Sequence, residues 1–185
     1  MIIALTGYMG SGKTTVGRIV ADALGCVFLD LDALIEKKAG KSVAEIFASD
    51  GEPAFRTLEA TVLADTVKRY AQGDAVLALG GGTILNPDSR RLLREKTLCI
   101  WLDAPAEVLW ERISVISTNP VPSSVISTEQ SARRDPLPSR PLADEDFAAR
   151  LTARLPLYAE AAEVTIDTSG LTPQDVADEI IISCL

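Results

Sequence analysis

The chain has 185 residues, of which 47% are hydrophobic, and a formal net charge of −8. This length and composition predict one globular domain with a substantial core. The acidic charge argues against nucleic acid as the main partner, because that binding relies on a basic surface, and no apolar run reaches the about 18 residues of a membrane-spanning helix.

The cysteines and the first residues of the chain indicate the cellular location of the protein. Cys26, Cys99 and Cys184 are scattered and odd in number, and the chain has no histidine, so neither a disulfide framework nor a zinc site is expected. The first apolar run leads directly into a glycine-rich segment, without the basic start of a secretory signal. We therefore expect a cytoplasmic protein with reduced thiols, in which a carboxylate serves as any catalytic proton acceptor.

Strand and helix patterns alternate along the chain. Apolar runs predict strands at residues 2–6, 26–30, 75–79, 97–102 and 163–167. Helical patterns with start and stop signals predict helices at residues 13–24, 32–40, 42–51, 52–70, from 86, 105–112, 144–161 and from 172. This alternation predicts an α/β fold with three layers, in which helices cover both faces of a five-stranded parallel sheet. Ligands of such sheets bind beyond the carboxyl ends of the strands.

The segment GYMGSGKTT, residues 7–15, has the spacing of a phosphate-binding loop. Gly7 is followed by four residues and then by Gly12, Lys13 and Thr14, which is the pattern G-x-x-x-x-G-K-[ST]. The loop joins a predicted strand to a predicted helix, so that backbone amides and the helix N-terminus would face one concavity. Lys13 is expected to bind the β- and γ-phosphates, and Thr14 a Mg²⁺ ion. The alternative is a turn that binds nothing, but this context favours a nucleoside triphosphate.

Two aspartates, Asp30 and Asp32, follow the second predicted strand in the segment FLDLD. Side chains at positions i and i+2 share a direction only while a strand continues. If it continues, both carboxylates could reach the phosphate loop, one toward Mg²⁺ and one toward a substrate hydroxyl. The alternatives are a solvated pair at the strand end, or Asp32 as the N-cap of the next helix.

Arg56 and the glycines Gly80–Gly82 allow two interpretations each. Arg56 lies three residues before Glu59, so it is either a substrate ligand or one half of a helical ion pair. Three glycines at a strand end allow a small molecule to lie against bare backbone, although a plain loop has the same sequence.

Residues 113–139 are rich in serine and proline and show little periodicity. A connection of this length without regular structure is typical of a functional lid or a disordered segment. A domain boundary is not expected here, because the chain that follows is too short to fold alone. We interpret the segment as a lid that closes over bound nucleotide.

The ordered motifs GYMGSGKTTVGR, FLDLDALIE, SVAEIFASDGEPAFRTLE, LALGGGTIL, RPL and RLPLY together resemble those of the shikimate kinases. The resemblance covers nearly the whole chain and implies a P-loop fold like that of nucleoside-monophosphate kinases. It implies one domain, residues 1–185, with a substrate-binding helical region at about 32–60 and a lid at about 113–143. The implied reaction is transfer of the γ-phosphate of ATP, with Mg²⁺, to the 3-hydroxyl of shikimate.

The resemblance also implies roles for individual residues. Those implied for the nucleotide are Gly10, Ser11, Gly12, Lys13, Thr14, Thr15, Arg112 and Arg140, and those for the metal are Thr14 and, through water, Asp30. Those implied for the substrate are Asp32, Arg56, Gly80, Gly81, Gly82 and Arg154. Asp32 is the candidate base, and Lys13 and Arg140 would also act in catalysis, with Arg140 arriving on the lid. Arg154 taken alone could equally lie on a solvated helix face.

Two other functions share part of this pattern. A kinase similar to gluconate kinase would have the phosphate loop, but it gives no reason for Gly80–Gly82 together with Arg56. A nucleotide-binding module without turnover gives no reason for the combination of Lys13, Thr14, Asp30 and Asp32. We therefore expect a shikimate kinase that binds shikimate and ATP as a monomer, with no nucleic acid or membrane partner.

Overall fold

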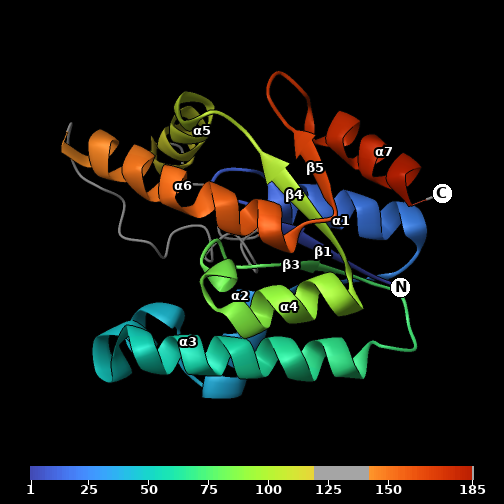
Figure 1. Ribbon diagram of the computed structural model, residues 1–185, viewed down its shortest axis with the longest axis horizontal. Helices are drawn as coiled ribbons and strands as arrows, with labels where there is room; N and C mark the ends of the chain where they lie inside the picture. The colour runs from blue at the N-terminus through green and yellow to red at the C-terminus, as the bar shows by residue number, and fades with distance from the viewer. Residues whose placement is uncertain (119–141, 185) are drawn as a thin grey trace.

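The computed structural model describes residues 1–118 and 142–184. This part of the chain contains one five-stranded sheet, with strands in the order β2-β3-β1-β4-β5 and all neighbouring pairs parallel. The strands are β1 (Ile2–Thr6), β2 (Val27–Asp30), β3 (Ala75–Ala78), β4 (Leu98–Asp103) and β5 (Val164–Asp167). The helices are α1 (Lys13–Leu24), α2 (Leu31–Ala39), α3 (Val43–Arg69), the 3₁₀ turn η1 (Thr83–Leu85), α4 (Pro87–Lys96), α5 (Ala106–Thr118), α6 (Leu142–Ala161) and α7 (Pro173–Ser183). The expected α/β fold with a parallel sheet is confirmed (Figure 1).

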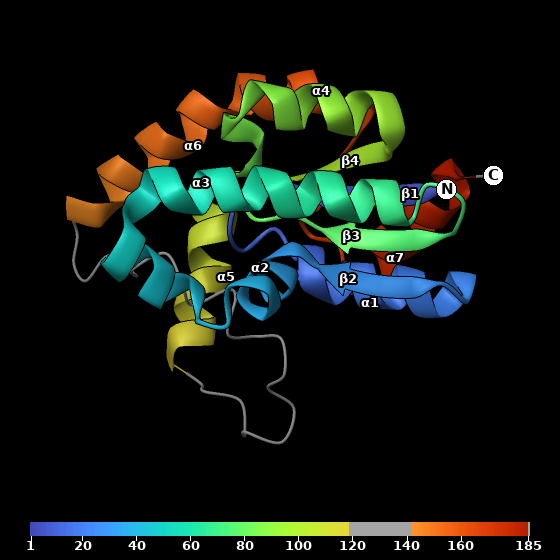
Figure 2. The same ribbon diagram turned by 90° about the horizontal axis from the view of Figure 1, so that it is seen from below.

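Helices cover both faces of the sheet, and each face has its own core (Figure 2). Helices α3, α4 and α6 pack on one face, where Ala4 of β1 belongs to the same buried cluster as Leu63 of α3. Helices α1 and α7 pack on the other face, where Leu5 of β1 belongs to the cluster of Val20 and Ile180. Consecutive residues of β1 therefore face opposite layers, as the alternation of side chains along a strand requires.

Side chains cap the helices where the sequence signals predict. Ser42 Oγ accepts a hydrogen bond from the Glu45 amide at 3.2 Å, and the Glu45 carboxylate accepts one from the Ser42 amide at 2.7 Å. Thr172 forms the same kind of capping box with Asp175 at the start of α7. Asn86 caps α4, which begins at Pro87. Each cap provides partners for amides that the first turn of a helix leaves without one.

The boundary expected at residue 51 is present as a kink within α3: Gly51 is not helical, with φ 79° and ψ 170°, and Pro53 follows it in the first turn of the second helical part. One other boundary differs from that expected. Helix α5 continues beyond Arg112 to Thr118, because Ile113 lies four residues after Leu109 and extends the same buried stripe.

The cysteines at positions 26, 99 and 184 are free in the described structure. Burial raises the pKa of Cys99 to about 12, which keeps it a neutral thiol. Among the described residues, none of the helices has the length and apolar character that crossing a membrane requires.

We predict that Thr172→Ala lowers the free energy of unfolding by about 1 kcal/mol, because the substitution removes the side-chain half of the α7 cap. Thr61→Ala is the matched control, since the Thr61 hydroxyl donates to the Thr57 carbonyl within its own helix and lies away from the helix start. Denaturant unfolding of both variants measures the difference. A Thr172 variant as stable as the Thr61 variant would show that the cap contributes nothing.

Candidate active site

The phosphate-loop pattern forms a tight turn between β1 and α1. Gly7, Gly10 and Gly12 have φ values of 144°, 81° and 91°, a region that favours glycine. A Cβ atom on Gly7 would lie 2.5 Å from the Leu102 carbonyl oxygen, so the first glycine is also required by the close approach of β4. Helix α1 begins at Lys13, directly after the loop, which places its N-terminus at this turn.

The functional groups of Lys13 and Thr14 lie on this loop. Lys13 Nζ donates hydrogen bonds to the carbonyl oxygens of Gly7 at 2.8 Å and Tyr8 at 2.9 Å, and it lies 3.4 Å from Ser11 Oγ. The Thr14 hydroxyl donates to Asp30 Oδ2 at 3.3 Å. The ammonium and hydroxyl groups at the start of α1 and the carboxylate at the end of β2 therefore lie together at the carboxyl end of the sheet.

Asp30 and Asp32 do not share a direction, because β2 ends at Asp30 and α2 begins at Leu31. Asp30 is the N-cap of α2: its Oδ1 accepts hydrogen bonds from the amides of Asp32 at 3.1 Å and Ala33 at 3.3 Å. The cap is thus Asp30, and not Asp32 as one sequence alternative held. The Asp32 carboxylate lies in the first turn of α2 beside Gly80, since a Cβ on Gly80 would come within 3.2 Å of Asp32 Oδ1.

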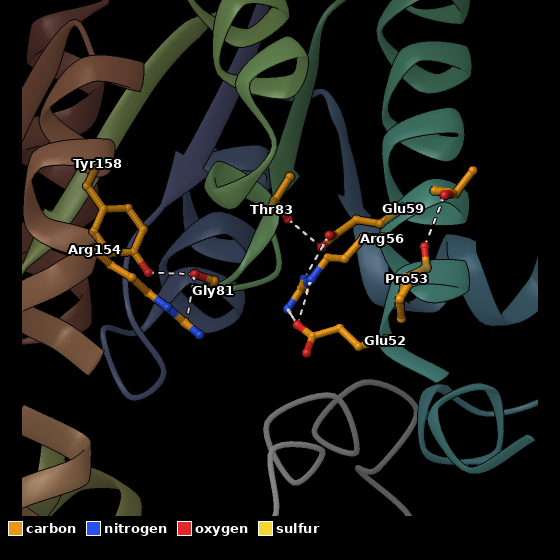
Figure 3. Close-up of polar contacts among 9 residues, drawn as sticks. Glu52, Pro53, Arg56, Glu59, Gly81, Thr83, Arg154 and Tyr158 are labelled. Atoms are coloured by element: carbon orange, nitrogen blue, oxygen red, sulfur yellow. Dashed lines mark hydrogen bonds and ion pairs between the residues drawn. The ribbon is translucent and has the colours of Figure 1, made fainter. Parts of the chain in front are cut away.

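Arg56 forms the helical ion pair with Glu59 that the sequence allows, and it also binds Glu52. Its Nη1 donates to Glu59 Oε2 at 2.8 Å, and its Nη2 donates to Glu52 Oε1 at 3.1 Å (Figure 3). Glu59 is only 2% exposed, and its Oε1 accepts a hydrogen bond from Thr83 Oγ1 at 2.8 Å. Burial by itself would lower the pKa of Arg56, but the charge of Glu59 and the hydrogen bonds to Glu59 and Glu52 outweigh it and raise that pKa.

The glycine segment lies directly against these groups. A Cβ atom on Gly82 would be 2.6 Å from Arg56 Nη2 and 2.7 Å from Nη1, and one on Gly80 would be 3.1 Å from Glu59 Oε1. The guanidinium of Arg56 therefore packs on bare backbone. The segment is more than a plain loop, because Thr83 at its end is hydrogen-bonded to Glu59.

Arg154 reaches the same segment from α6. Its Nη1 donates to the Gly81 carbonyl at 3.3 Å, and the Tyr158 hydroxyl donates to the same oxygen at 2.6 Å (Figure 3). Its guanidinium carbon lies 5.2 Å from the centroid of the Tyr8 ring, within the range of a cation–π contact. Arg154 is thus half-buried at the site and not on a solvated helix face.

The remaining predicted nucleotide ligands have different positions. Thr15 is exposed in the first turn of α1. Arg112 donates to the Thr168 hydroxyl at 2.9 Å and to the Thr168 carbonyl at 2.7 Å, at the carboxyl end of β5. Arg140 and most of the expected lid, residues 119–141, lie outside the described residues.

The sequence interpretation missed Glu59, Thr83, Tyr158 and Tyr8 as parts of the site. From the sequence, Glu59 is expected only as an ion-pair partner that would give Arg56 a structural role instead of a role in binding. In the structure Arg56 contacts both Glu59 and the glycine segment. The available signal was a carboxylate on the apolar side of a helix, between the buried residues Phe55, Val62 and Leu63. Thr83 and Tyr158 give no comparable signal in one sequence.

Comparison with known proteins gives a consistent result. Residues 9–185 match the protein family described as shikimate kinase. A shikimate kinase from Symbiobacterium thermophilum is 43% identical over 182 residues, which span 98% of this chain and 94% of that relative. The structure of the shikimate kinase from Acinetobacter baumannii in complex with shikimate has a TM-score of 0.82 at 34% identity and covers 99% of this chain and 92% of its own.

The shikimate kinase from Aquifex aeolicus has a TM-score of 0.76 at 28% identity, over 100% of this chain and 96% of that structure. The family match includes both Lys13 on the phosphate loop and Arg154 on α6, so it extends across both groups of residues described above. The chain therefore belongs to the shikimate kinase family.

Proposed function

We propose that this chain transfers the γ-phosphate of ATP to the 3-hydroxyl of shikimate at the carboxyl edge of the sheet, giving shikimate 3-phosphate and ADP. The observation that supports this assignment best is the pair of arginines at the glycine segment. Arg56 of α3 contacts Gly82 and Arg154 of α6 contacts Gly81, beside the carboxylate of Asp32. This arrangement suits a small ring with one carboxylate and several hydroxyls, because guanidinium groups bind carboxylates through two parallel hydrogen bonds.

The phosphate loop and the start of α1 hold the nucleotide. The ligands in this group are Gly10, Ser11, Gly12, Lys13, Thr14 and Thr15. The ammonium of Lys13 exchanges its present carbonyl partners, Gly7 and Tyr8, for the phosphate oxygens that carry more negative charge. Arg112 and Arg140 complete the group, Arg140 as part of the lid.

The pair formed by Thr14 and Asp30 fits a Mg²⁺ ion. The Thr14 hydroxyl and Asp30 Oδ2 are 3.3 Å apart, and Mg²⁺ takes oxygen ligands of these two kinds while keeping several waters. The family resemblance implies that Asp30 would bind the ion through water; its Oδ2 faces Thr14, while its Oδ1 caps α2. When bound, the ion neutralises charge on the phosphates during transfer.

The substrate lies between α2, α3 and α6, with its carboxylate on Arg56 and Arg154 and its ring on Gly80–Gly82. Asp32 accepts a hydrogen bond from the attacking hydroxyl and orients it, and it takes the proton if it acts as the base. Residues 32–60 thus form the substrate region and about 113–143 the lid of a single domain.

All the residues assigned above belong to one chain, so a single copy can hold both substrates, and we infer a monomer. The free thiols of Cys26, Cys99 and Cys184 support a cytoplasmic location. Neither of the other functions weighed from the sequence, a gluconate-kinase-like enzyme or a module without turnover, is favoured by any contact described above.

The direct test of the activity is ADP release, measured with shikimate, gluconate and several nucleoside monophosphates as acceptors. We expect release to depend on shikimate and to be at background with the other acceptors. Release that is no faster with shikimate than with buffer would refute the proposed function.

We predict that Asp32→Asn lowers kcat by about 10²- to 10⁴-fold with little change in the KM for ATP, because the attacking hydroxyl loses its proton acceptor. Asp88→Asn is a matched control: Asp88 is also an aspartate in the first turn of a helix, but it pairs with Arg91 on α4. Steady-state kinetics of the two variants separate the role of the carboxylate from a general effect of charge at a helix start. A kcat within three-fold of the unaltered enzyme would contradict it.

We predict that Gly82→Ala raises the KM for shikimate by about ten-fold. The added methyl group would lie 2.6 Å from Arg56 Nη2 and would displace the guanidinium, and small misplacements of a substrate ligand are costly. The backbone of Gly82, with φ −104° and ψ 0°, accepts alanine. Gly73→Ala is the control, because nothing lies within 4 Å of a Cβ there. Equal KM values for the two variants would indicate that Arg56 does not bind the substrate.

A further inference from the structure

The two carboxylates that bind Arg56 differ in how firmly they are held. Glu59 is 2% exposed and has a second partner, Thr83, so its position is fixed from two sides. The Glu52 side chain is 60% exposed and binds Arg56 alone among the described residues. An exposed ion pair of this kind contributes little to stability, and Glu52 can therefore leave Arg56 at low cost, whereas Glu59 cannot.

Glu52 occupies one particular edge of the Arg56 guanidinium. Its Oε1 accepts hydrogen bonds from both Nε, at 3.3 Å, and Nη2, at 3.1 Å. The other edge is engaged, because Nη1 is bonded to Glu59, and Gly82 lies against one face of the guanidinium, since a Cβ there would be 2.6 to 2.9 Å from Nη2, Nη1 and Cζ. The Nε–Nη2 edge is the part of the fork that remains for an incoming carboxylate, and pairs of N–H groups at such an edge bind carboxylates well.

We propose that Glu52 takes the place of the substrate carboxylate on Arg56 in the free enzyme, and that shikimate binds by displacing it. This inference rests on the proposed assignment of Arg56 to the substrate carboxylate. Glu52 is four residues before Arg56 on the same helix, so it is a tethered competitor that returns whenever the site empties. The displacement costs some affinity, and in exchange Arg56 stays oriented and charge-compensated between turnovers.

The same competition acts on the product. Phosphorylation of the 3-hydroxyl leaves the carboxylate unchanged, so shikimate 3-phosphate must also hold Arg56 against Glu52. Return of Glu52 to Arg56 therefore assists product release, a step that limits many enzymes. We therefore expect removal of the Glu52 carboxylate to tighten the binding of substrate and of product by the same factor.

The test is calorimetric binding of shikimate and of shikimate 3-phosphate to the full chain carrying Glu52→Gln. We expect both dissociation constants to fall by about two- to five-fold, the range set by an exposed ion pair. Asp65→Asn is the control, since Asp65 is an exposed carboxylate on the same helix that pairs with Lys38, and we expect it to leave both constants unchanged. Weaker or unchanged binding to the Glu52→Gln variant would overturn the proposal, because Glu52 would then position Arg56 or be neutral.

Two more variants separate the possible explanations. Glu52→Asp keeps the charge but is one methylene shorter and does not reach the Nε–Nη2 edge, so we expect it to tighten binding as Glu52→Gln does. If the Glu52→Asp variant binds shikimate as tightly as the unaltered enzyme does, only the negative charge at position 52 matters. That result would also overturn the proposed displacement of Glu52 by the substrate carboxylate. Arg56→Ala tests the assignment beneath the proposal: unchanged shikimate affinity there refutes the proposed carboxylate site, whereas a large loss there with no gain in Glu52→Gln refutes only the role of Glu52.

Discussion

The ion pair between the buried Glu59 and the half-buried Arg56 joins the substrate side of the site to the sheet. Glu59 is held on α3 at 2% exposure, its Oε2 binds Arg56 and its Oε1 binds Thr83 after β3. Loss of Arg56 would leave the buried Glu59 carboxylate without its charge partner, which is unfavourable because a buried charge needs compensation. The position of Arg56 is therefore tied to the glycine segment by an interaction that the fold cannot easily give up, and the contacts of Arg56 with Gly82 and Glu52 follow from it.

The glycine segment connects the two halves of the site. Gly81 accepts hydrogen bonds from Arg154 and Tyr158 of α6, and a Cβ on Gly81 would lie 3.5 Å from the Gly7 carbonyl oxygen and 3.6 Å from the Met9 amide. A side chain at position 81 would therefore be in ordinary van der Waals contact with the phosphate loop, which shows that the glycine segment lies directly beside that loop.

The features of this structure that could be predicted from one sequence are those that depend on local interactions between residues close together in the chain. The phosphate loop has fixed glycine spacing, and the capping signals at Ser42, Asn86 and Thr172 use local hydrogen bonds, so both are visible without tertiary information. The order β2-β3-β1-β4-β5 was not predicted, since alternation of strands and helices implies parallel pairing but does not state which strands are neighbours. Residue Glu59 illustrates the limit: an i,i+3 spacing identifies an ion pair but not its burial.

The residue at which β2 ends determines the positions of the carboxylates of Asp30 and Asp32. Asp30 and Asp32 would point the same way only if the strand continued through both residues. The strand instead ends at Asp30, whose carboxylate caps α2 and remains beside Thr14, while the first turn of α2 directs Asp32 toward Gly80. Capping fixes Asp30 through two backbone amides, so its second oxygen is presented to the phosphate loop in one orientation. Ending the strand one residue earlier or later would place Leu29 or Leu31 at the N-cap position, and neither side chain can accept hydrogen bonds from the first amides of the helix as Asp30 does.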